Sequence, residues 1–147
     1  MIRILAAVIT LPLAACAPAP GTDGGAAPSQ VAQTEASVGV GGEARLGGLS
    51  VRVLGLVEDS RCPASVQCIQ AGTVRIAVRL GQDGGAREAV LQLRETEPLA
   101  GGRALHFYGA CPAAGTPGAA RAEERYRFHL AVAPAGSDMP NPPMCAP

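Results

Sequence analysis

Residues 74–80 read Val-Arg-Ile-Ala-Val-Arg-Leu, and this alternation of apolar and polar side chains decides the fold class. Successive side chains of a β-strand point to opposite faces, so a period of two predicts a strand with one buried face. Residues 81–85 follow with three glycines and an aspartate, which is typical of a turn. Residues 88–93 resume the strand pattern, so residues 73–93 are expected to form a β-hairpin.

Further segments with this period flank the hairpin. Glycine or proline clusters separate most of them, and the polar connection over residues 94–102 contains Pro98. Residues 110–122 are expected to be a loop, with one helical turn near residues 119–124. About seven short strands and no long helix predict an all-β domain, namely a small β-sandwich, with a small barrel as the alternative. The pattern does not separate an immunoglobulin-like topology from others. The expected flanking strands are 37–40, 43–46, 51–58, 104–108 and 126–132.

The aromatic residues lie on or beside the late strands. We expect Phe107, Tyr108, Tyr126 and Phe128 to fill the core. His129 falls on the opposite side of its strand from Phe128, where a surface histidine is the expectation.

Composition limits the function classes. The chain has 147 residues, a formal charge of zero, and twelve basic residues that are all arginine. After a leader and a linker are subtracted, about 100–110 residues remain, which is enough for one domain. No cluster of basic residues indicates binding to nucleic acid. No glycine-rich loop precedes a helix, so no nucleotide cofactor is predicted.

The first residues have the features of an export signal. Arg3 supplies a positive charge, and an apolar run over residues 4–13 is too short to span a bilayer. Residues 13–16, Leu-Ala-Ala-Cys, resemble the lipobox of bacterial lipoproteins. That resemblance implies cleavage before Cys16 and acylation of its thiol; an ordinary secretory signal is the alternative. No aspartate follows Cys16, which favours the outer membrane, with the domain facing the periplasm.

The chain is therefore divided into four parts. Residues 1–15 are a signal peptide, and residues 16–36 are the lipidated cysteine and a flexible tether rich in Pro, Gly, Ala and Ser. Residues 37–133 are the sandwich domain. Residues 134–147 are a proline-rich tail, expected to be tied back by a disulfide.

The four cysteines after Cys16 allow three pairings. Cys62 and Cys68 flank a short segment, and we expect a local disulfide that stabilises the domain by roughly 2.4 kcal/mol in the chain-entropy model. Zinc would need further ligands at short paired spacings. Cys111 and Cys145 then remain to pair, which would contribute roughly 3.8 kcal/mol. Export to an oxidising compartment supports both bonds.

The polar loop between residues 58 and 72 is the main candidate for function. Asp59 and Ser60 are turn formers, and Arg61 is expected to pair with Glu58 or Asp59 near the surface. The loop is either a structural corner or a rigid binding loop. The candidate binding residues are Asp59, Ser60, Arg61, Val66, Gln67 and Gln70.

Residues 59–63, 66–69 and 71–72 resemble the signature DSRCP, V-x-C-x-W-A-G. This signature belongs to a family of small bacterial secreted proteins and lipoproteins, most of them uncharacterised. Gln70 stands where the family usually has Trp, which places a shared ligand surface in doubt. The resemblance implies an all-β extracytoplasmic domain and brings no catalytic residues.

Three functions remain open, and none is catalytic. The leading hypothesis is a binding module that meets an envelope protein, a polymer or a small ligand. The first alternative is a protease-inhibitor-like protein that inserts Arg61 into a protease cleft. The second is a copper- or redox-linked site, because thioether, thiol and imidazole groups suit copper. Its candidate ligands are Met139, Met144 and Cys145, with His106 and His129. No metal or cofactor is predicted by spacing, and Ser60 lies in no nucleophile motif.

Overall fold

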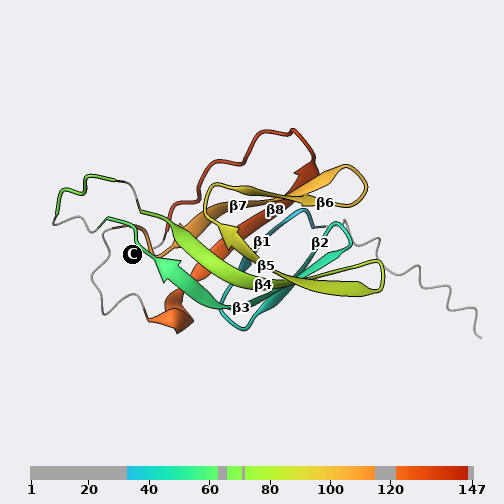
Figure 1. Ribbon diagram of the computed structural model, residues 1–147, viewed down its shortest axis with the longest axis horizontal. Coiled ribbons are helices and arrows are strands. Elements are labelled where there is room, and N and C mark those ends of the chain that lie inside the picture. The colour runs from blue at the N-terminus through green and yellow to red at the C-terminus, as the bar shows by residue number, and fades with distance from the viewer. Residues whose placement is uncertain (1–32, 63–65, 71, 115–121, 146–147) are drawn as a thin grey trace, which may run out of the picture.

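The computed structural model describes residues 33–62, 66–70, 72–114 and 122–145. These residues form eight β-strands and one short 3-10 helix, η2 (Glu123–Arg125) (Figure 1). The strands are β1 (Glu35–Val38), β2 (Glu43–Leu46), β3 (Leu49–Asp59), β4 (Val74–Gln82), β5 (Gly85–Gln92), β6 (Thr96–Leu99), β7 (Arg103–Cys111) and β8 (Arg127–Pro134).

The strands form two four-stranded antiparallel sheets, which confirms the predicted small β-sandwich. We call β1-β8-β7-β6 the first sheet and β2-β3-β4-β5 the second sheet. Every hydrogen-bonded pair of strands is consecutive in the chain, except that β1 pairs with β8. The order is therefore a meander whose first and last strands meet. An immunoglobulin-like topology is wrong for this domain, because that topology needs Greek-key connections.

The core lies between the sheets and consists of their inward-facing side chains. Its largest fully buried members include Tyr126, Phe107 and Phe128, as the sequence predicted. Phe128 makes an edge contact with Phe107 at 5.9 Å and stacks on Tyr126 at 5.6 Å between ring centroids. Tyr108 is buried outside this core cluster, and its hydroxyl donates to the Glu35 carboxylate at 3.3 Å. All four aromatic side chains are thus buried as expected, with Tyr108 outside the central cluster.

Two elements differ from the expected boundaries. Strand β6 forms inside the predicted polar connection, with Pro98 in it. It lies at the edge of its sheet, where a missing N–H is tolerated because only one side of the strand is paired. The β4–β5 turn is also tighter than expected, since Gln82 pairs with Gly85. Asp83 and Gly84 have φ values of 51° and 81°, as a two-residue type I′ hairpin turn requires.

The domain begins earlier than the expected boundary at residue 37. Strand β1 starts at Glu35, within the segment predicted as tether. The carbonyl oxygens of Gln33 and Thr34 accept hydrogen bonds from the backbone N–H groups of Gly47 and Val132, at 2.9 and 2.7 Å. Residues 33–36 therefore belong to the folded domain. The predicted signal peptide and Cys16 lie outside the described residues.

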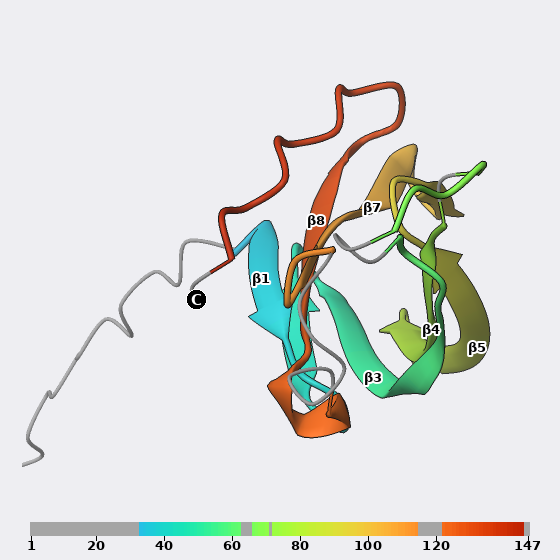
Figure 2. The same ribbon diagram turned by 90° about the vertical axis from the view of Figure 1, so that its left-hand side faces the viewer.

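The tail from Ala135 to Cys145 has no regular structure and runs along the outer face of the first sheet (Figures 1 and 2). The Cys111–Cys145 disulfide ties it to the end of β7, which confirms that predicted pairing. Pro143 lies so close to Gly109 that a β-carbon there would overlap the proline ring. His129 is the cross-strand neighbour of Gly109, and it is half-buried instead of being a fully exposed surface residue.

Candidate functional site

The candidate site is the connection between β3 and β4, which we call the disulfide loop (residues 60–73). It projects from one end of the sandwich (Figure 1). Cys62 and Cys68 form the predicted disulfide within it. Residues 63–65 and 71, part of the candidate loop, lie outside the described residues.

The base of the loop continues the β3–β4 ladder by one more pair of residues. The Ser60 backbone N–H donates to the Thr73 carbonyl oxygen at 2.9 Å, and the Thr73 N–H donates to the Ser60 hydroxyl at 3.1 Å. A β-carbon at Gly72 would overlap the carbonyl group of Ser60. Ser60 and Gly72 therefore shape the loop base, and the exposed Ser60 hydroxyl is engaged by backbone.

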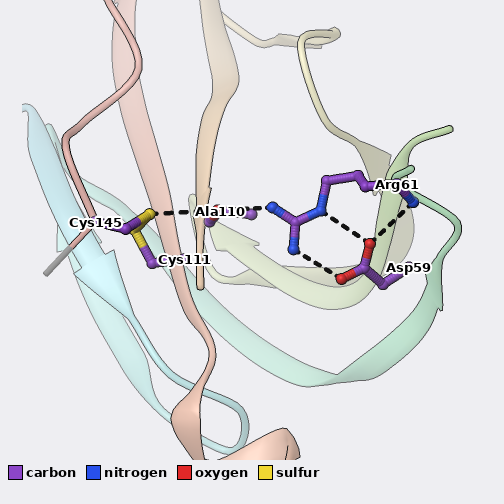
Figure 3. Close-up of a disulfide and its surroundings, with 5 residues drawn as sticks. All are labelled: Asp59, Arg61, Ala110, Cys111 and Cys145. Atoms are coloured by element: carbon purple, nitrogen blue, oxygen red, sulfur yellow. Dashed lines mark hydrogen bonds and ion pairs between the residues drawn. A yellow bond between two sulfur atoms is a disulfide. The ribbon is translucent and has the colours of Figure 1, made fainter. Parts of the chain in front are cut away.

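A buried ion pair between Asp59 and Arg61 lies at the start of the loop. We call this pair, together with its partners Tyr126 and Ala110, the Asp59–Arg61 clamp. Figure 3 shows the pair and Ala110. The Arg61 guanidinium donates twice to the Asp59 carboxylate, from Nε at 2.9 Å and from Nη2 at 2.7 Å. Its Nη1 donates to the Ala110 carbonyl oxygen at 3.0 Å. The Tyr126 hydroxyl donates to Asp59 Oδ2 at 2.6 Å. Bidentate, charge-assisted bonds of this kind fix both side chains in one geometry.

The electrostatics of the clamp favour both charged forms. Burial alone would raise the pKa of Asp59, but hydrogen bonds from Arg61 and Tyr126 lower the pKa to about 2. The hydrogen bonds that Arg61 donates to Asp59 in turn raise the pKa of Arg61 against the opposing effect of burial. The pair is therefore ionised throughout the physiological pH range.

The clamp overturns one expectation about Arg61. The sequence indicated a surface pair with Glu58 or Asp59, but Arg61 is only 8% exposed and pairs with Asp59. Glu58 lies near Arg75 instead, at 3.6 Å on the surface. The reason is tertiary, because Ala110 and Tyr126 come from distant parts of the chain and enclose the guanidinium and the carboxylate.

The exposed part of the loop is its tip, residues 66–70. Val66 is 55% exposed and Ile69 is completely exposed, while Gln67 and Gln70 are exposed beside them. The predicted candidates thus divide into two groups: Asp59 and Arg61 support the base, whereas Val66, Gln67 and Gln70 face solvent. Ile69 was missed, although a bulky apolar residue in a polar loop is the signal that would have identified it.

The Cys111–Cys145 disulfide lies beside the clamp. Ala110, which accepts the Arg61 hydrogen bond, precedes Cys111, and the Cys145 sulfur lies 3.8 Å from the same carbonyl oxygen (Figure 3). One backbone carbonyl therefore joins the base of the disulfide loop to the anchor of the tail.

The histidines and the cysteine named for copper belong to no cluster of metal-binding side chains among the described residues. In the part of the chain that the structure describes, no three His, Cys, Asp or Glu side chains are placed to hold a metal ion. Cys145 is in a disulfide, and Met144 is almost fully exposed. His106 is 2% exposed, with Nδ1 at 2.9 Å from the Thr96 hydroxyl. The redox alternative therefore has no assembled ligand set among the described residues.

Two further observations bear on identity. None of the helices in the described ranges is long and apolar enough to cross a membrane. Comparison of the chain with family models, curated proteins and solved structures found no match.

Proposed function

We propose that this chain is a lipid-anchored envelope lipoprotein whose domain is a non-enzymatic binding module. The tip of the disulfide loop is its contact surface. The observation that supports the proposal is the complete exposure of Ile69 on a loop whose base is fixed by a disulfide and a buried ion pair. Cover by a partner would remove this apolar side chain from water, which is favourable.

The geometry suits binding because the loop is held before the partner arrives. Ordering a flexible loop on association costs affinity, and a constraint at the loop base reduces that cost. Burying one isoleucine side chain contributes about 1.5–3 kcal/mol, which is the scale of an interface hot spot. Gln67 and Gln70 beside it supply hydrogen-bonding groups without a charge that must be desolvated.

The partner that fits this tip is another envelope protein. A sugar polymer is commonly bound by aromatic stacking or charged groups, and the described tip residues 66–70 contain neither. An apolar centre with an uncharged polar surround matches the core and rim of a protein interface. The tip contains no side chain that would attract nucleic acid.

The anchor in this proposal is an acyl group on Cys16, supported by the Leu-Ala-Ala-Cys pattern. With residues 33–36 in the folded domain, a tether of about sixteen residues has a root-mean-square reach of about 22 Å, so the domain stands off the outer membrane on its periplasmic side. Mass spectrometry of the protein from native membranes tests this part. An unmodified Cys16 in the mature chain would refute the anchor without affecting the loop proposal.

The protease-inhibitor alternative is not favoured. It required Arg61 to enter a cleft, and each nitrogen of that guanidinium already donates within the clamp. The copper alternative loses Cys145 to its disulfide.

A crosslinking experiment tests the binding surface. A photoreactive amino acid replaces Ile69 or Gln67 in the full-length lipoprotein in its native cells, with the exposed tail residue Asp138 as the control position. We expect the same single adduct from both tip positions and none from position 138. Ile69→Asp should weaken binding of that purified partner at least tenfold. Equal labelling from all three positions, or none at the tip, would remove the proposal.

A further inference from the structure

A second candidate site lies at the end of the sandwich opposite the disulfide loop. It is a cleft of about 420 Å³ beside the β4–β5 turn, between β5 and β6. Leu49 and Leu80 are buried at its floor, and Leu99 contributes a partly buried side wall. The remaining lining residues are Gln82, Asp83, Gly85, Ala86, Arg87, Pro98 and Ala100.

The cleft exists because the two sheets separate at this seam. Strands β5 and β6 are the last strands of their sheets and are not hydrogen-bonded to each other. The Arg87 guanidinium bridges the seam to the Glu97 carboxylate at 2.7 Å, on the solvent-exposed side. The cleft is therefore an opening between two sheet edges, with core side chains as its apolar floor.

An added peptide strand does not fit this seam well. Pro98 has no N–H to donate, and β6 is only four residues long, so one wall cannot continue a ladder. A small molecule needs no ladder. The volume lies within the range of about 300–1,000 Å³ that is usual for small-molecule sites.

The charges at the rim identify the kind of ligand. Arg87 is paired with Glu97, and Asp83 accepts a hydrogen bond from the Gln82 amide at 3.0 Å. The charged lining groups thus already have partners, so a charged ligand would have to displace one of them. An uncharged molecule would lose less solvation on entering a floor made of leucine side chains.

We propose that this cleft binds an uncharged, mostly apolar small molecule, with at most a hydroxyl or carbonyl group at the Gln82–Asp83 rim. This site goes beyond the proposed loop function. Leu49 and Asp59 lie at the two ends of the 11-residue strand β3, which at roughly 3.3 Å per residue is about 30 Å long. The two sites are therefore independent surfaces.

Photolabelling with a decanol analogue that carries a diazirine tests the proposal. The full-length lipoprotein is reconstituted in lipid nanodiscs, irradiated, digested and mapped by mass spectrometry. We expect saturable labelling on peptides that contain residues 82–87 or 98–100, and competition by 1-decanol. Decanoate, which has the same chain and a carboxylate, should compete at least tenfold more weakly.

Cavity-filling variants supply the control. Ala86→Phe and Ala100→Phe place a ring in the cleft from exposed positions and should reduce labelling at least tenfold. Val90→Phe adds the same ring at an exposed site on β5 outside the cleft and should leave labelling unchanged. Labelling spread over the domain, or unchanged in both cleft variants, would overturn the site. Equal competition by decanoate would overturn the uncharged ligand class.

Discussion

The guanidinium of Arg61 donates to the carbonyl oxygen of Ala110 at 3.0 Å, across 49 residues of sequence. Arg61 precedes Cys62, and Ala110 precedes Cys111, so this one bond connects the two disulfide-bonded regions of the domain. It also explains why an arginine is needed at this position. The planar guanidinium spreads its donors over three nitrogens, so it meets both oxygens of Asp59 and a third acceptor at once, whereas the three donors of a lysine lie on a single nitrogen.

Replacement of Arg61 by alanine should destabilise the domain strongly. The change leaves the buried Asp59 carboxylate with the Tyr126 hydroxyl and the backbone N–H of residue 61, but without its cationic partner. Loss of one partner from a buried ion pair lowers the free energy of unfolding by about 3–5 kcal/mol. Urea denaturation measures the free energy of unfolding. The matched control is Arg75→Ala, which breaks the exposed pair with Glu58. It should lower the free energy of unfolding by no more than about 1 kcal/mol. Similar losses in both variants would mean that the clamp contributes little.

The clamp should also make stability depend on pH in the acid range. The pKa of Asp59 is lowered from 3.8 to about 2 in the folded state, so the unfolded state binds its proton first as the pH falls. The stabilisation is therefore complete above the unfolded pKa of 3.8 and is lost as the pH falls towards 2.

Asp59→Asn isolates this contribution from those of the other carboxylates. Unfolding free energies of the wild type and the variant, measured between pH 5 and 2, should converge as the pH falls, by up to about 2 kcal/mol. A difference that stays constant over this range would show that Asp59 is not the titrating group.

The tail should contribute to stability through its disulfide. The double variant Cys111→Ser, Cys145→Ser removes closure of a 35-residue loop, worth roughly 3.8 kcal/mol in the chain-entropy model. We expect a lower midpoint in urea and faster proteolysis after residue 134, because the tail has no regular structure of its own. Unchanged proteolysis would show that packing alone retains the tail.

A single methyl group at Gly109 should displace the tail from the first sheet. The added β-carbon would overlap the ring of Pro143. Gly109→Ala should therefore lower the free energy of unfolding by about 1–3 kcal/mol, or make the tail accessible to proteases. Gly55→Ala is the matched control on β3, since its β-carbon would meet no atom within 4 Å. If the two variants behave alike in denaturation and in proteolysis, the tail does not pack on Gly109.

Local patterns were enough to place most of the strands and both disulfides. The hairpin around residues 81–85 and the strand before the disulfide loop follow from period and turn chemistry, which act over a few residues. Short spacing led to Cys62–Cys68, and parity then led to Cys111–Cys145 once Cys16 was assigned to the predicted lipid anchor. Strand β6 was not predicted, because four residues that contain Pro98 carry almost no periodic signal.

The sequence by itself determined the all-β class, the turns and the cysteine pairs. The first two depend on residues that are neighbours in the chain, and the third on the spacing and number of the cysteines. Only the tertiary structure decided which side chains of the candidate loop are available. Burial is set by contacts between distant segments: Ala110 and Tyr126 enclose Arg61 and Asp59, while no described segment covers Ile69. Contacts between distant segments also decide that β1 pairs with β8 and that the tail passes over Gly109. Sequence periodicity shows that one face of a strand is apolar, but it does not show which segment packs against that face.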